Sequence, residues 1–145
     1  MAKLRHIALS VKDPWKTAEF YEQAFDMKRV GETDSELARG VYVSDGVITM
    51  ALLAYKTDEW AGYVDGEDER GKNYEGIHHM GFWVDDLPET EEKIEGAGGK
   101  YFQGRPDGPE PTTFYEMKFG DPNGIILDVT HLGWSGSVKN VKKAD

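Results

Sequence analysis

The sequence predicts an α+β fold made of two tandem βαβββ modules. The first observation is an internal repeat, in which "HIALSVKDPWKTAEFYEQAF" aligns with "HMGFWVDDLPETEEKIEGAG". The second is that an aspartate and then a proline follow the apolar run in both copies, as is typical where a helix begins. The third is that strand-like segments separated by Gly-containing turns follow each predicted helix. Because one module alone leaves a face of its sheet bare, we expect the two modules to pair.

The first module is predicted over approximately residues 4–55. Its opening strand places Ile7, Leu9 and Val11 on one face and His6, Ala8 and Ser10 on the other. Asp13 and Pro14 mark the start of a helix, whose apolar positions recur at helical spacing. The segments "ELARGVYVSD" and "GVITMALLAY" then predict two strands joined by a turn at Asp45.

The second module is predicted over approximately residues 77–132 and repeats this order. Its helix begins after Asp86 and ends at Gly98 and Gly99, where a left-handed helix end is common. The segments "TTFYEMKFG" and "GIILDVTHL" predict two later strands joined by the turn "DPNG". The acidic segment 56–76 is expected to be a linker with some local structure, and 133–145 a C-terminal tail. We expect all of these parts to form one domain, residues 1–145.

Composition narrows the classes of function. The 145 residues carry a formal net charge of −10, which disfavours binding to nucleic acid or to an anionic membrane surface. There is no apolar run long enough to span a membrane and no signal-peptide pattern, so we expect a cytoplasmic protein. The absence of cysteine excludes disulfides, thiolate nucleophiles and Cys-type zinc sites.

Strand alternation predicts a cluster of metal ligands. If the more apolar face of each strand packs on a helix, then His6, His79 and Asp128 lie on the opposite, common face. A carboxylate within the apolar strand "IILDVTHL" is costly to bury unless a cation compensates its charge. Two histidines and one carboxylate leave coordination positions open and suit Fe²⁺, Mn²⁺ or Zn²⁺. The same alternation places His78 on the helix side, at the solvent-exposed rim.

With these residues assigned, the sequence resembles the vicinal oxygen chelate superfamily, which includes glyoxalases, bleomycin-resistance proteins and extradiol dioxygenases. The resemblance rests on "HIALSVKDP", "HMGFWVDDL" and "DPNGIILDV". It implies a U-shaped mixed sheet around a cleft, in which one divalent metal ion binds a small substrate through neighbouring oxygens. His6 and His79 match the ligands of the first strands, and Asp128 matches a family glutamate. Dimers are common in these families, so a homodimer is one expected assembly.

The resemblance leaves the reaction open between dioxygenase and glyoxalase-like lyase or isomerase chemistry. Aligning Val47 with Ile125 puts Met50 at the fourth ligand position of the glyoxalases, where a thioether cannot act as a base. Tyr115 is the candidate catalytic phenol. Four residues are candidates for contact with the substrate, namely Trp83, Met50, Lys118 and Arg105.

The alternative function is that of a small-molecule binding protein. Bleomycin-sequestering members of the superfamily use an acidic and aromatic cleft, without metal chemistry, to hold a cationic guest. The present chain is acidic, but it has both histidines.

Overall fold

The computed structural model describes residues 1–59, 61 and 70–143. The first module comprises β1 (Lys3–Ser10), α1 (Pro14–Phe25), β2 (Lys28–Asp34), β3 (Ala38–Ser44) and β4 (Thr49–Tyr55). The second comprises β5 (Gly76–Trp83), α2 (Leu87–Gly96), β6 (Lys100–Gln103), β7 (Met117–Gly120) and β8 (Ile126–Thr130). The strands β2 and β6 are the third later strand of each predicted βαβββ module, for which the sequence analysis named no segment.

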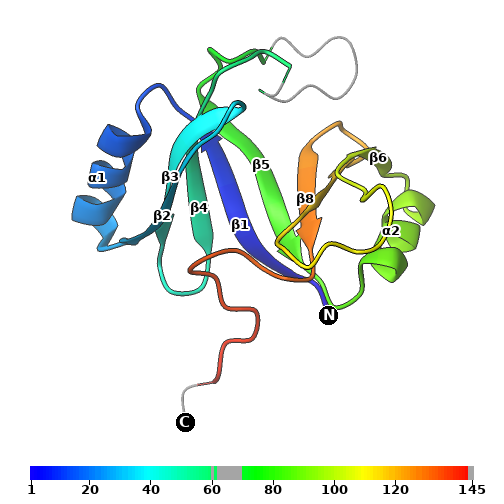
Figure 1. The fold of residues 1–145 in the computed structure, drawn as a ribbon. Helices are drawn as coiled ribbons and strands as arrows, with labels where there is room; N and C mark the ends of the chain where they lie inside the picture. Colours follow the sequence, from blue (N-terminus) through cyan, green and yellow to red (C-terminus); the bar gives the residue numbers. More distant parts are fainter. Residues whose placement is uncertain (60, 62–69, 144–145) are drawn as a thin grey trace.

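The strands form one mixed sheet in the order β2-β3-β4-β1-β5-β8-β7-β6. The two opening strands, β1 and β5, are antiparallel neighbours at its centre, and each pairs in parallel with the last strand of its own module. The helices lie on opposite outer flanks of the curved sheet, α1 beside β2 and β3 and α2 beside β6 (Figure 1). The α+β class and the two-module arrangement are therefore confirmed.

Each helix is stabilised at its start as the Asp-Pro pairs predict. The carboxylate of Asp13 accepts a hydrogen bond from the backbone N–H of Lys16, and that of Asp86 accepts one from Glu89. Both helices bury their inner faces against the convex side of the sheet, in two separate apolar cores. The opposite, concave side of the sheet is therefore free to form a site.

Two β-bulges interrupt the pairing of β1 with β5. Leu4 faces Phe82 and His6 faces Gly81, so Arg5 is an extra residue on β1. Likewise Ala8 faces His79 while Leu9 faces Ile77, which makes His78 the extra residue on β5. A bulge breaks the strict alternation of side chains and can redirect one of them.

The segment after β8 returns across the sheet to the first module. The Thr49 hydroxyl donates to the Ser135 carbonyl over 2.5 Å, and the Val138 N–H donates to the Val47 carbonyl over 3.0 Å. The Arg5 guanidinium binds the carbonyls of Val138 and Lys139. These contacts bring Trp134 over the start of β1. Neither helix of the described chain is long and apolar enough to cross a membrane.

Candidate metal centre

Three buried ligand groups converge at the centre of the concave face. His6 lies on β1, His79 on β5 and Asp128 on β8, and one ligand atom from each lies within 4.8 Å of the others. His6 Nε2 is 3.2 Å from His79 Nε2, which is 2.9 Å from Asp128 Oδ2. The exposed fractions of the three side chains are 5% or less. The structure thus brings together the three residues predicted as ligands.

The spacing of these atoms fits a single cation. Two ligand atoms about 2.1 Å from one metal ion lie about 3.0 Å apart when their bonds are perpendicular. Asp128 Oδ2 and His6 Nδ1 are buried without a hydrogen-bond partner among the described residues, although His79 Nε2 approaches the carboxylate oxygen closely. Buried polar atoms are seldom left unsatisfied, so a cation shared by these groups would remove the cost of burying Asp128.

Lys118 binds the other carboxylate oxygen of Asp128, Oδ1. Its ammonium donates to Asp128 Oδ1 over 2.7 Å and lies 3.3 Å from Glu116 Oε1. Burial opposes ionisation of Asp128, but His79 and Lys118 hold the pKa of its carboxyl well below the usual range. Burial would also lower the pKa of Lys118, yet the two carboxylates raise it above its ordinary value. Asp128 is therefore an anion whose second oxygen, Oδ2, does not contact Lys118 and faces His79 Nε2 at 2.9 Å.

The ring of His6 is positioned by stacking against Trp134. The indole of Trp134 stacks on the His6 ring, with centroids 4.7 Å apart and planes inclined by 8°, and its Nε1 donates to Glu116 over 3.0 Å. Gly81 makes this stack possible, because a Cβ there would lie 2.7 Å from the indole and 2.8 Å from His6 Cβ. Burial and then the neighbouring His79 lower the pKa of His6 to about 3, so the ring is a neutral ligand.

His78 is buried beside His79, and its predicted place at the exposed rim is wrong. Its Nδ1 lies 2.8 Å from His79 Nδ1 and 3.3 Å from the Tyr55 hydroxyl, while its Nε2 lies 2.6 Å from the Ala61 carbonyl. The physical reason is the bulge, which turns two consecutive side chains toward the same cavity. Burial and then His79 lower the pKa of His78 to about 4, so its ring is also neutral near pH 7.

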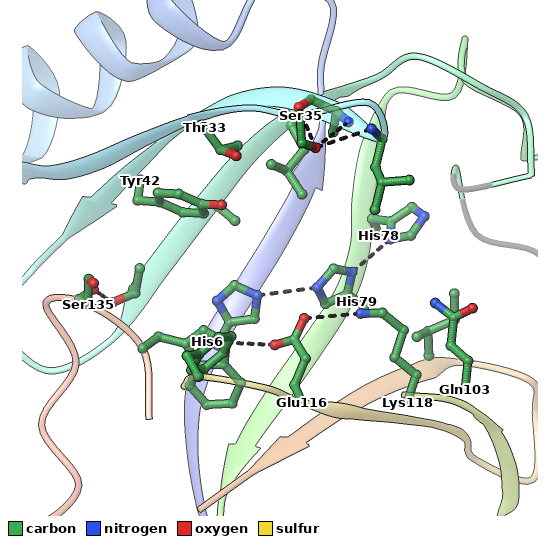
Figure 2. Close-up of a pocket in the computed structure, with 18 of the residues that line it drawn as sticks. His6, Thr33, Ser35, Tyr42, His78, His79, Gln103, Glu116, Lys118 and Ser135 are labelled. Atoms are coloured by element: carbon green, nitrogen blue, oxygen red, sulfur yellow. Dashed lines mark hydrogen bonds and ion pairs between the residues drawn. The ribbon is translucent and has the colours of Figure 1, made fainter. Parts of the chain in front are cut away.

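The ligands open onto a cavity of about 880 Å³. Figure 2 shows His6 and His79 facing each other, with Glu116 and Lys118 on one side of them and Tyr42 and Thr33 on the other. Much of the wall is apolar or aromatic, with contributions from Leu37, Ala51, Leu53, Tyr55, Phe102, Phe114, Ile126, Leu132 and Trp134. Burial, reinforced by Asp128, raises the pKa of Glu116.

The fourth ligand position of the predicted arrangement is occupied by Ala51 rather than Met50. His6 pairs with Thr49 and His79 pairs with Ile126, so the residue equivalent to Asp128 is two positions after Thr49. Met50 points to the opposite side and packs in the core beneath α1. The alignment was one residue out of register, and one residue along a strand reverses the face.

The predicted catalytic residue Tyr115 and two predicted substrate-contact residues, Trp83 and Arg105, lie outside the cavity. Tyr115 packs in the core beneath α2, and its hydroxyl lies 3.3 Å from Glu110. The Trp83 indole donates to the His131 carbonyl and covers Gly133. Arg105 pairs with Glu91 of α2 and lies 4.1 Å above the Tyr101 ring. Lys118 is the one candidate for substrate contact that the structure places in the cavity.

Strand alternation gave a signal for two cavity residues that the sequence interpretation missed. Glu116 alternates with Tyr115 and shares the face of Lys118, and Tyr55 shares the face of Ala51. Trp134 gave no such signal, because it follows the last strand and reaches the site through the fold of the tail.

The site and fold define a protein with a buried set of two histidines and one carboxylate on a paired βαβββ sheet. The family model described as "Glyoxalase/Bleomycin resistance protein/Dioxygenase superfamily" matches residues 3–129. The chain belongs to this superfamily, which confirms the resemblance found in the sequence.

One curated relative shares sequence similarity with the chain. A 4-hydroxyphenylpyruvate dioxygenase from Pseudomonas sp. (strain P.J. 874) is 29% identical over 129 residues, an alignment covering 77% of this chain and 34% of the relative. The chain therefore spans about a third of the length of that curated relative.

Solved structures share the fold at low sequence identity. A hypothetical protein from Bacillus halodurans C-125 superposes with a TM-score of 0.64 at 18% identity, covering 99% of both chains. The Streptomyces coelicolor methylmalonyl-CoA epimerase in complex with 2-nitronate-propionyl-CoA gives a TM-score of 0.63 at 18% identity, with coverage of 88% of this chain and 94% of the epimerase.

Proposed function

We propose that the protein is a divalent-metal-dependent enzyme that acts on a small substrate with two neighbouring oxygens. The observation that carries this proposal is the convergence of His6, His79 and Asp128 on one buried point with an unsatisfied carboxylate oxygen. A bound divalent ion would supply Lewis-acid or oxygen-activating chemistry at this point. The chain itself supplies two imidazoles, a carboxylate held by Lys118 and a largely apolar cavity wall.

Dioxygenase-type chemistry with Fe²⁺ is the preferred form of the proposal. Two histidines and one carboxylate on one side of the ion leave positions open for both substrate and dioxygen. Ala51 supports this choice, because the module-one equivalent of Asp128 has no donor atom that would close one of these positions. The similarity to a 4-hydroxyphenylpyruvate dioxygenase adds support from sequence.

The cavity favours a compact substrate with an apolar or aromatic body. Lys118 is the one Lys or Arg side chain among the described residues that line it, and its ammonium is engaged by Asp128 and Glu116. A phosphate-rich group would therefore find no free cation inside. The aromatic side chains of Phe102, Phe114 and Trp134 offer surfaces against which a planar ring can pack.

Lyase or isomerase chemistry is a second candidate, and Glu116 is the reason for it. Its carboxylate lies in the cavity beside Lys118, and because its pKa is raised it accepts a proton more readily than an ordinary carboxylate. The indole of Trp134 donates to one of its oxygens and orients it. Such a base could serve proton abstraction next to a carbonyl.

Metal analysis followed by paired activity assays would test the proposal. The untagged protein, His79→Ala and the control His131→Ala would be loaded with Fe²⁺ under anaerobic conditions, and with Mn²⁺ or Zn²⁺ in parallel. We expect about one ion per chain in the wild type and in His131→Ala, and little in His79→Ala. Oxygen uptake with catechols and arylpyruvates would report dioxygenase activity, and conversion of hemithioacetals would report lyase activity.

The outcomes separate the classes of function. A wild-type protein that takes up no metal under these conditions would contradict the proposal. Tight binding of a cationic aromatic guest by such a metal-free protein would instead favour the sequestering alternative. Hemithioacetal conversion that disappears in Glu116→Gln, without oxygen uptake in the wild type, would favour the lyase or isomerase.

A further inference from the structure

The histidine doublet forms a hydrogen-bonded chain that ends on a backbone carbonyl. His78 Nε2 lies 2.6 Å from the Ala61 carbonyl oxygen, and His78 Nδ1 lies 2.8 Å from His79 Nδ1. A carbonyl oxygen only accepts hydrogen bonds, so His78 Nε2 must carry the hydrogen. As a neutral ring, His78 then has a lone pair on Nδ1, which accepts a hydrogen from its neighbour.

The tautomer of His79 follows from that of His78. If His78 Nδ1 accepts, His79 Nδ1 must donate, which leaves His79 Nε2 to face the proposed metal site. Nε2 lies 3.2 Å from His6 Nε2 and 2.9 Å from Asp128 Oδ2, and because a carboxylate oxygen only accepts, a bound cation would take the place of a hydrogen between these two atoms. The Tyr55 hydroxyl is the more distant partner of His78 Nδ1, at 3.3 Å.

We propose that His78 is a positioning residue that, held by the Ala61 carbonyl, fixes His79 in the Nδ1–H tautomer and commits its Nε2 to the metal. The proposal rests on the metal site proposed above, which it deepens. Ligating histidines in proteins generally donate their second ring N–H to a carboxylate, carbonyl or water, and this donor orients the ring. Here the acceptor is a neighbouring imidazole, which directs the ring without adding a negative charge to the site.

The bulge on β5 is what makes this relay between consecutive residues possible. In a regular strand, adjacent side chains point to opposite faces, and two neighbouring rings cannot share a hydrogen. Both rings are buried, with exposed fractions of 4% for His78 and 5% for His79. Ala61 is fully buried, and its N–H donates to the Asp58 carbonyl, so the acceptor belongs to a defined turn.

The first experiment reads the tautomers directly in the metal-free protein. Long-range ¹H–¹⁵N correlation spectra with ¹⁵N-labelled histidine distinguish the two neutral ring forms, and His78→Gln and His131→Gln assign the signals. Near pH 7.5 we expect a hydrogen on His78 Nε2 and a hydrogen on His79 Nδ1. A spectrum with His79 as the Nε2–H tautomer would overturn the inference, whether or not the wild type binds metal.

The second experiment measures the affinity for Co²⁺ by its visible absorption. We expect His78→Leu to weaken binding by about 10- to 100-fold, the usual cost of losing a hydrogen-bond partner of a ligand. His78→Gln should recover much of this loss, because its amide can both accept from His79 and donate to Ala61. The matched control is His131→Leu, whose ring pairs with Glu110 outside the cavity and whose loss should leave affinity within about threefold.

The two experiments keep the inference distinct from the metal site itself. A wild type without Co²⁺ affinity contradicts the proposed function, while the spectra still decide the tautomers. Equal affinities in His78→Leu, His78→Gln and the wild type would contradict the positioning role. If His78→Leu does not fold, the Co²⁺ affinity of His78→Gln and the wild-type spectra still test the positioning role of His78.

Discussion

The two modules share a backbone plan but differ at the positions that carry chemistry. In each, a central strand presents a histidine and pairs in parallel with the last strand of the module, His6 opposite Thr49 and His79 opposite Ile126. Two positions further along that last strand, module two has Asp128 and module one has Ala51. The backbone of both modules therefore places equivalent residues around one site. The side chain at each of these positions decides whether it can bind a metal ion.

Each module also has one bulge residue on its opening strand, and the two bulge residues differ in role. Arg5 and His78 are both extra residues that directly precede a ligand histidine. The Arg5 side chain reaches the carbonyls of Val138 and Lys139 in the tail, whereas the His78 ring enters the cavity. The same backbone irregularity therefore attaches the tail in one module and, in our proposal, supports a candidate ligand in the other.

Removing Asp128, the carboxylate that distinguishes module two from module one, should have the largest effect on metal affinity and stability. We expect Asp128→Ala to lower metal affinity by more than about 100-fold, beyond the usual effect of an outer-sphere change. It also leaves the Lys118 ammonium without its shorter partner, so unfolding free energy should fall by about 3 kcal/mol. Dialysis with metal analysis and urea unfolding would measure the two effects. Unchanged metal content would exclude Asp128 as a ligand.

Adding a metal-binding side chain at Ala51, the equivalent position in module one, tests whether this position also faces the metal ion. Ala51→Glu places a carboxylate in the cavity opposite the existing ligands, where it would close an open coordination position. We expect oxygen uptake to fall at least about tenfold while affinity for Mn²⁺ or Zn²⁺ is retained. Ala51→Leu, which adds bulk without a donor, is the control. Identical metal affinities and rates in the two variants would show that Ala51 does not mark a ligand position.

The buried histidines of the two modules should make the metal-free protein sensitive to acid. The folded-state pKa values are about 3 for His6 and about 4 for His78, below the unfolded value of 6.5. Between the folded and unfolded pKa values, the unfolded state binds more protons than the folded state. The contribution of the two neutral rings to the free energy of unfolding is therefore complete above about pH 6.5 and is lost as the pH falls. The two rings together give a slope of up to about 2.7 kcal/mol per pH unit near pH 5.

Urea unfolding of the metal-free protein at pH 7, 6 and 5 would measure this slope. Glu116, whose pKa is raised in the folded state, contributes with the opposite sign near its own titration. His78→Gln should remove about half of the histidine contribution and leave that of His6. A slope that does not change in this variant would show that His78 does not titrate between the two states.

The smallest effect is expected from the bulge residue of module one. Arg5→Ala removes hydrogen bonds to two tail carbonyls, and we expect a loss of about 1–2 kcal/mol in unfolding free energy. Metal affinity should stay within about threefold, unlike that of His78→Leu. Urea unfolding and Co²⁺ titration measure both quantities, and Arg105→Ala, which removes one member of an exposed ion pair, is the control with a smaller expected loss. A tenfold loss of affinity would show that the tail supports the ligands.

The repeat and the strand alternation were enough to predict the fold and to select three converging residues. They succeeded because both modules begin with the same strand-Asp-Pro-helix pattern, because the bulge at Arg5 lies before His6 so that β1 alternates regularly from His6 onward, and because Asp128 lies on a regularly paired stretch. Alternation failed at His78, where an extra residue reverses the face. No local pattern in "GIHHMGFW" marks the bulge, which depends on pairing with β1.

Unequal turns explain the error at Met50. The Asp45 N–H donates to the carbonyl of Ile48, whereas the Asp121 N–H donates to that of Ile125, so the second turn is one residue longer. An alignment without pairing information cannot locate that extra residue. For Tyr115 the choice of face depended on where β7 begins, and Met117 at its start packs beneath α2.

The stacking of Trp134 on His6 gives the site a built-in optical signal. An indole in face-to-face contact with an imidazole should change its emission when that imidazole gains or loses a bound ion, and paramagnetic ions should quench it. The same ring belongs to the segment that crosses back to module one. The Trp134 part of the emission of the four tryptophans, taken as the difference from Trp134→Phe, therefore offers a label-free titration that reports both detachment of the tail and loading of the centre.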